Sequence, residues 1–187
     1  YAPHIIENGG QLPSHLDEAT QQAVRDLVQQ AAQSMGIRNG VVKGDIVVSD
    51  GKPHVIELAA RLSGGYFCTH EIPLNTGVDL VGAAIRQALG EAVDPADLQP
   101  RFNRPVAQRY LLPGAGRLRA ISGIEEAKAV GGVEELLVTA KPGDLLRDPA
   151  DSNCSVAMVI ATGASRVEAI ASAERAIGHL HVEMMPL

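Results

Sequence analysis

Two acidic residues stand inside β-rich and otherwise apolar runs of this sequence. Asp45 lies in residues 41–48, and Glu57 lies in residues 54–59. A carboxylate is costly to bury in a strand unless a cation or a metal compensates its charge. We therefore expect both acids to have a positively charged partner. Lys43, two residues before Asp45, is interpreted as a solvated charge at the strand edge or as a charge that steers phosphate.

The register of the hairpin between these runs decides whether the two acids can act together. The connection, residues 49–53, is rich in turn-forming residues. A two-residue turn would pair Asp45 with Ile56 and point the two carboxylates to opposite faces. Because Pro53 has no N–H for a ladder bond, we expect a longer loop, with Asp45 opposite Glu57 and their Cα atoms about 5 Å apart.

Two carboxylates in this arrangement suit Mg²⁺. This ion takes hard oxygen ligands and uses one or two protein carboxylates, with phosphate oxygens and water completing the octahedron. Arg61 follows Glu57 along the chain, and its guanidinium is suited to bind a phosphate or an acyl-phosphate. Ser63 and Gly64 open a Gly-rich loop that either borders the phosphates or is only a flexible turn.

Residues 36–90 resemble the signature of the ATP-grasp superfamily, with a strand acid, a second acid twelve residues later in a hydrophobic-Glu-x-x-x-Arg strand, and a Gly-rich loop. The resemblance implies that Asp45 and Glu57 are metal ligands for the Mg²⁺ ions that bridge the ATP phosphates, with Mn²⁺ as an alternative. It also implies that Arg61 is catalytic and stabilises the phosphoryl group or acyl-phosphate. The implied cofactor-binding residues are Arg61, Ser63 and Gly64.

One position departs from that pattern, because the superfamily usually has Asn two residues after the second acid and this chain has Ala59. Either water replaces the amide oxygen, or the second metal site is weaker, or catalysis has been lost. The helix start at residues 77–81 resembles biotin carboxylase, carbamoyl phosphate synthase and the L-amino-acid ligases. Residues 104–184 are similar to the tail domain of amino-acid-ligase-like members.

The elements that must position these residues follow from the periodicity of apolar side chains. A helix is expected after an S-x-x-D start signal at residues 14–17, with apolar side chains at helical spacing over residues 23–35. The hairpin follows it, and a second helix is expected over residues 78–89 with Ile85 and Leu89 on its inward side. Three prolines between residues 91 and 105 indicate a linker.

The expected fold class is α+β, with two domains. Residues 1–92 would be the C-terminal part of an ATP-grasp domain, built as helix, antiparallel hairpin and helix. Residues 104–187 would be a small α+β domain on an antiparallel sheet. A 45% hydrophobic content with 3% aromatics supports such a core.

Composition also narrows the classes of partner. A net charge of −6 argues against binding nucleic acid or anionic lipid. We found no signal peptide and no apolar run near membrane-spanning length, so a cytoplasmic location is expected. A metal or Cys–His interpretation of Cys68 and His70 lacks a second ligand pair, and we expect His70 and Glu71 to line the substrate side of the cleft instead.

The resulting hypothesis is a C-terminal fragment of an ATP-dependent carboxylate–amine ligase that acts through an acyl-phosphate. The chain starts at Tyr1, which suggests a longer parent. The partners would be small-molecule carboxylate and amine substrates and the missing N-terminal part, and the fragment alone is expected to be inactive. The alternative is a non-catalytic regulatory or dimerisation module derived from an ATP-grasp protein, and a homodimer is a further expectation.

Overall fold

The computed structural model describes residues 3–185, and the chain divides into two compact units. We call Ser14–Asn103 the hairpin unit. The residues up to Pro13 and those from Arg104 onward form the sheet unit. The mixture of helices and antiparallel strands confirms the expected α+β class. Within the described residues, none of the helices combines the length and hydropathy that a membrane span requires.

The division differs in one respect from the expected domains, residues 1–92 and 104–187. The N-terminal strand β1 (Gly9–Leu12) pairs antiparallel with β4 (Val106–Leu111), so the first residues belong to the sheet unit. Arg109 on β4 holds this strand, because its Nη1 donates a hydrogen bond to the Gly10 carbonyl at 3.2 Å. No periodic signal marked so short a strand in the sequence.

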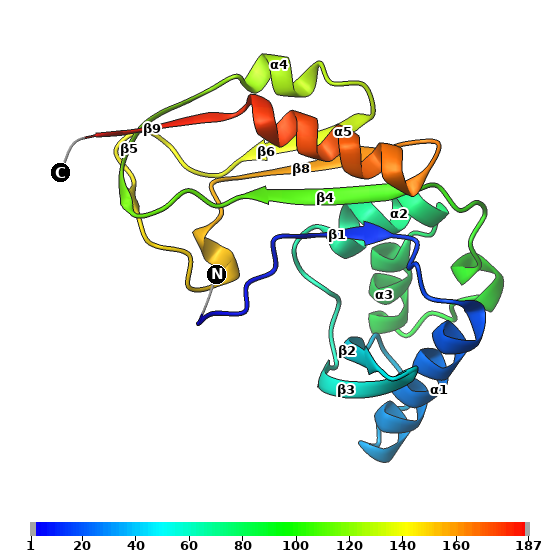
Figure 1. Ribbon diagram of the computed structural model, residues 1–187. Helices are drawn as coiled ribbons and strands as arrows, with labels where there is room; N and C mark the ends of the chain where they lie inside the picture. The colour runs from blue at the N-terminus through cyan, green and yellow to red at the C-terminus, as the bar shows by residue number, and fades with distance from the viewer. Residues whose placement is uncertain (1–2, 186–187) are drawn as a thin grey trace. The chain divides into compact units, whose positions relative to one another are not determined.

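The hairpin unit follows the expected order of helix, hairpin and helix (Figure 1). Apolar side chains of its first helix face the hairpin, since a Cβ added at Gly44 would lie 3.6 Å from Val28 Cγ2. Its elements are α1 (Glu18–Ser34), β2 (Lys43–Ser49), β3 (Lys52–Ala59), the π-helix η1 (Phe67–Glu71), α2 (Ile72–Thr76), α3 (Leu80–Ala88) and the 3₁₀-helix η2 (Pro95–Leu98).

Helix α1 begins at a side-chain cap. The Oδ1 atom of Asp17 accepts a hydrogen bond from the Thr20 N–H at 2.8 Å, which satisfies one of the unpaired donors of the first turn. This hydrogen bond, together with that from the Thr20 hydroxyl, lowers the pKa of Asp17 below the ordinary value of an aspartic acid.

The cap predicts a pH-dependent effect of Asp17→Ala. Because the pKa of Asp17 is lower in the folded state, its contribution to stability is complete above pH about 4 and is lost as pH falls through the folded-state pKa. Urea unfolding should therefore show Asp17→Ala less stable than wild type at pH 6, with the gap narrowing at pH 3. An equal gap at both values would contradict a role for the ionised cap.

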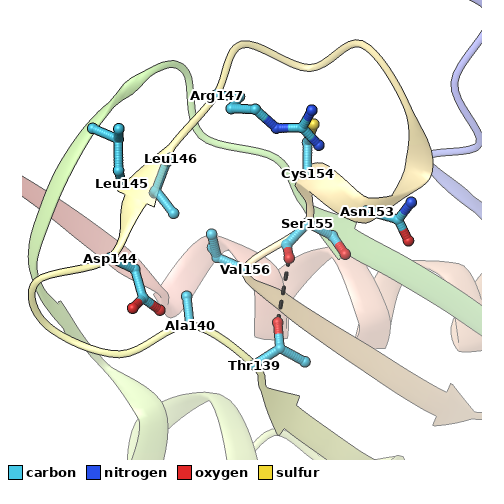
Figure 2. A pocket seen from close by; sticks show the side chains of 10 residues that line it. All are labelled: Thr139, Ala140, Asp144, Leu145, Leu146, Arg147, Asn153, Cys154, Ser155 and Val156. Carbon is cyan, nitrogen blue, oxygen red and sulfur yellow. Dashed lines mark hydrogen bonds between the residues drawn. The ribbon is translucent and has the colours of Figure 1, made fainter.

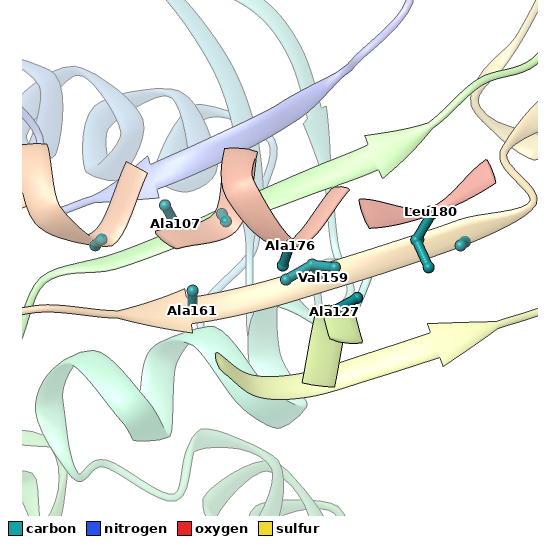
Figure 3. Close-up of a cluster of buried hydrophobic side chains, with 9 residues drawn as sticks. Ala107, Ala127, Val159, Ala161, Ala176 and Leu180 are labelled. Carbon is teal, nitrogen blue, oxygen red and sulfur yellow. The ribbon is translucent and has the colours of Figure 1, made fainter. Parts of the chain in front are cut away.

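The sheet unit has a four-stranded antiparallel sheet in the order β1-β4-β8-β6, and α5 packs on one face of it. The contact is made largely by alanines, including Ala176 of α5 beside Val159 of β8, which lets helix and sheet approach closely (Figure 3). The elements after β4 are β5 (Gly116–Ser122), α4 (Ile124–Lys128), β6 (Val133–Val138), β7 (Leu145–Leu146), η3 (Ser152–Cys154), β8 (Ala157–Thr162), α5 (Arg166–His179) and β9 (His181–Met185).

One feature of the expected second helix is wrong. Ile85 and Leu89 were expected to point inward, but they are 56% and 73% exposed. Val78 and Ala83 are the buried apolar residues of this region. The helix itself ends as expected, at Gly90 in the left-handed conformation (φ 81°).

Candidate functional site

The hairpin that carries the acids closes with a two-residue turn. Ser49 lies opposite Lys52, which leaves Asp50 and Gly51 as the turn residues. Their φ angles of 50° and 71° are both positive, as the common tight hairpin turn requires. The longer loop expected because of Pro53 is therefore wrong, and Pro53 lies within β3.

A β-bulge farther from the turn brings the two acids opposite each other, which a regular hairpin with this tight turn would not do. Ile46 lies opposite Val55, but the next residue back along β2, Asp45, lies opposite Glu57. Ile56 is thus the extra residue on β3, and the register shifts by one. The prediction that Asp45 and Glu57 face each other is confirmed, although a bulge achieves it and not a longer loop.

The acid pair lies on the face of the hairpin that solvent reaches. The Asp45 and Glu57 side chains are 53% and 59% exposed. Ile46, Val55 and Leu58 are less exposed and alternate with them along the strands. This alternation places the two carboxylates on the side of the hairpin from which a ligand could approach.

Lys43 supplies the positive charge that the acids were expected to need. Its ammonium forms an ion pair with Asp45, and its Nζ lies 3.8 Å from Glu57 Oε1. The Lys43 side chain is only 21% exposed, so the interpretation as a solvated edge charge is wrong. A single cation therefore contacts both carboxylates in this structure. The signal in the sequence was the spacing of two residues, which places Lys43 and Asp45 on one face.

The residues expected on the phosphate side lie on the loop that follows β3. The Arg61 N–H donates to the Ala59 carbonyl at 2.9 Å, while the exposed guanidinium donates to the Leu62 carbonyl at 3.0 Å. Ser63 is half-buried, and Gly64 is exposed with open space where a Cβ would be. Between residues 3 and 185, no ion pair joins Arg61 to either acid, so the structure groups the acids but not the loop residues with them.

A π-helical turn follows this loop. Tyr66 enters it with φ 66°, and η1 then carries Cys68 and Glu71 in buried positions. The His70 ring packs edge-on to Tyr66 at 5.2 Å between centroids, and its Nδ1 lies 2.8 Å from the Thr69 hydroxyl. Single π-helical turns are frequent at functional sites. A role for His70 and Glu71 beside the substrate stays a prediction.

Comparisons with known proteins bear on both units. Residues 109–185 match the family model described as L-amino acid ligase C-terminal domain 2. An uncharacterised protein, y4rH, from Sinorhizobium fredii (strain NBRC 101917 / NGR234) is 27% identical over 185 residues, which are 98% of this chain and 38% of that protein.

Solved structures match nearly the whole chain. The L-amino acid ligase from Bacillus licheniformis superposes with a TM-score of 0.84 at 23% identity, over 98% of this chain and 46% of that one. The biotin carboxylase domain of the Hydrogenobacter thermophilus 2-oxoglutarate carboxylase, solved with MgADP, ADP and bicarbonate, matches at 0.70 and 19% identity, over 95% of this chain and 39% of that one.

The chain has the fold of the C-terminal part of an ATP-grasp ligase. This confirms the resemblance predicted from the hairpin and the Gly-rich loop. The chain spans less than half the length of the relatives described above.

The donor set on this hairpin suits a metal that takes its other ligands from outside these side chains. Within residues 3–185, no group of three or more His, Cys, Asp or Glu side chains could hold a metal by itself. Asp45 and Glu57 offer two carboxylates to one cation, as Lys43 shows, and Mg²⁺ takes its remaining ligands from phosphates and water. Ala59, opposite Lys43, offers no side-chain ligand.

Proposed function

We propose that this chain is part of an ATP-dependent carboxylate–amine ligase and contributes metal ligands to its ATP site. The observation that carries the proposal is the Asp45–Glu57 pair, brought to one face by a bulge on a hairpin of the ATP-grasp fold. Two relatives support it by their names: one is an L-amino acid ligase, and the other was solved with MgADP and bicarbonate.

In this proposal Asp45 and Glu57 hold Mg²⁺, which when bound neutralises the ATP phosphates and orients them. Lys43, which pairs with both acids in this structure, would then be released and could offer its ammonium to a phosphate oxygen. Arg61, on the loop that follows β3, would stabilise the negative charge on the transferred phosphoryl group, and Ser63 and Gly64 would border the phosphates.

The proposed reaction has two steps. A carboxylate oxygen of the first substrate attacks the γ-phosphorus of ATP, and the bond to ADP breaks, which leaves an acyl-phosphate. The amine nitrogen of the second substrate then attacks the acyl carbon, phosphate leaves with the bonding electrons, and the nitrogen loses a proton to give the amide. Arg61 is suited to both steps because phosphate charge develops in each.

Several parts of the proposal lie outside the described residues. The N-terminal part of the parent would supply the rest of the ATP site and of the substrate pockets. The reaction would take place in the cytoplasm.

Ala59 leaves one ligand position to water, and we expect the second metal ion to bind more weakly as a result.

The alternative is a non-catalytic regulatory or dimerisation module. Two observations favour it: Lys43 already compensates the acids, and Ala59 stands where an amide ligand is usual. In such a module the ion pairs would simply stabilise the hairpin. The family model matches residues 109–185, and we would look for the homodimer contact of such a module in this part of the chain.

ADP release by the full-length parent separates the two candidates. The assay would combine Mg²⁺, ATP and a panel of carboxylates and amines, with each component omitted in turn. A ligase should release ADP only when Mg²⁺ and both substrates are present, with one amide formed per ADP. A folded parent that binds no nucleotide in the presence of Mg²⁺ would support the module instead.

A further inference from the structure

A polar pocket of about 410 Å³ lies in the sheet unit, where β7 approaches the end of β6 and the start of β8 (Figure 2). This volume is within the range of small-molecule sites. The residues proposed to bind Mg²⁺ and ATP belong to the hairpin unit, and none of them lines this pocket.

The pocket wall carries one charge of each sign. Asp144 and Arg147 flank the two residues of β7 and both line the pocket. The Asp144 carboxylate is held by the Lys141 N–H, which donates to Oδ2 at 2.9 Å. Among residues 3–185, Asp144 has no ion-pair partner. A wall with one carboxylate and one guanidinium suits an occupant that is itself zwitterionic better than a simple anion.

Arg147 is available to such an occupant. Its Nη2 lies 3.4 Å from Asp151 Oδ2, and both side chains of this pair are largely exposed. An exposed pair of this kind contributes little, so a ligand carboxylate can replace Asp151 at the guanidinium. Asp151 keeps a separate hydrogen bond from the Asn153 N–H at 2.8 Å, which lowers its pKa and keeps it ionised.

The rest of the lining suits a peptide-like group. Strand β7 lies at the edge of a second, three-stranded sheet in the order β7-β5-β9, so its outer backbone groups have no strand partner in the described chain. The Asn153 side chain also forms no hydrogen bond within residues 3–185. Leu146 and the buried Val156 add an apolar surface that fits a small side chain.

We propose that this pocket binds a zwitterionic amino acid or dipeptide, with the ligand carboxylate on Arg147 and the ligand ammonium on Asp144. The outer edge of β7 and the Asn153 amide then bind the peptide group. The pocket is lined by residues of the sheet unit alone, whereas Asp45 and Glu57 belong to the hairpin unit, and the proposal assigns its occupant as a regulatory ligand of the parent. Its test is also separate, because it needs neither ATP nor Mg²⁺.

The test is a nuclear magnetic resonance titration of the 187-residue chain with three forms of one probe. L-alanyl-L-alanine carries both charges, its N-acetylated form only the carboxylate, and its methyl ester only the ammonium. We expect the zwitterion to shift the amide signals of residues 139–147 and 153–156, and to bind at least about tenfold more tightly than either capped form.

Substitutions at the two charges complete the test. Arg147→Met and Asp144→Asn should each weaken binding of the zwitterion about tenfold. Asn at 144 keeps an acceptor for the Lys141 N–H, so the turn is retained. Arg119→Met is the matched control, because Arg119 is an exposed arginine of the same unit outside the pocket. Equal binding of all three probes, unchanged binding in both pocket variants, or no shift at these amides would overturn the proposal.

Discussion

Glu57→Ala in the full-length parent lowers the rate of Mg²⁺-dependent ADP release by at least about a hundredfold. The reason is that one of the two carboxylates facing each other on the hairpin is lost, so the remaining Asp45 must hold the cation alone. The apparent affinity for Mg²⁺ should fall with the rate. The measurement is ADP release as a function of Mg²⁺ concentration at saturating ATP.

A loss of folding would not explain this result, since Glu57 is 59% exposed and its only ion pair in the described chain is the long one to Lys43. Urea unfolding of the Glu57→Ala variant should match wild type closely. Glu183→Ala provides the control, because Glu183 is another exposed strand carboxylate with one long ion pair, to Arg119. If both variants kept the wild-type rate and Mg²⁺ dependence, Glu57 would not be a metal ligand.

Gly123→Ala is expected to destabilise the sheet unit by about 3 kcal/mol. Gly123 precedes α4 with φ 79°, and an added Cβ would lie 1.8 Å from the carbonyl oxygen of His179. The obstacle is backbone at the end of α5, which cannot rotate away as a side chain can. Both the left-handed conformation and the close approach therefore oppose any side chain at this position.

The measurement is the free energy of urea unfolding, with a thermal melt as a second readout. Gly131→Ala is the control, because Gly131 has no positive φ and nothing lies within 4 Å of its added Cβ. The same chemical change should there be nearly neutral. A Gly123→Ala variant as stable as the control would show that α4 can shift away from the end of α5 at little cost.

The sequence was sufficient to predict that Asp45 faces Glu57, but not the β-bulge that produces this pairing. Two carboxylates in apolar runs indicate a compensating cation, and the longer loop expected from Pro53 was the argument that placed Asp45 opposite Glu57. The longer loop was expected because Pro53 has no N–H that could donate a hydrogen bond to the neighbouring strand. In a two-stranded hairpin, however, alternate N–H groups point away from the partner, and a proline is tolerated there.

Other features depend on contacts that periodicity does not encode. Helical spacing identified Ile85 and Leu89 as apolar positions but could not show that both would be exposed. The charge of Lys43 was evident, yet its place between two carboxylates depends on the hairpin register. The sheet-unit pocket left no signal, because Arg147 and Asn153 are ordinary loop residues in the sequence and meet only in the fold.

The extra residue at Ile56 also affects how this site can be recognised in distant relatives. With the same two-residue turn, a regular hairpin would place the partner of Asp45 eleven residues along the chain, whereas the bulge makes the interval twelve. Deleting Ile56 would remove the bulge and leave both carboxylates facing each other. Evolution can therefore gain or lose one residue between the acids without changing their chemistry, and a search that fixes this interval would overlook genuine homologues.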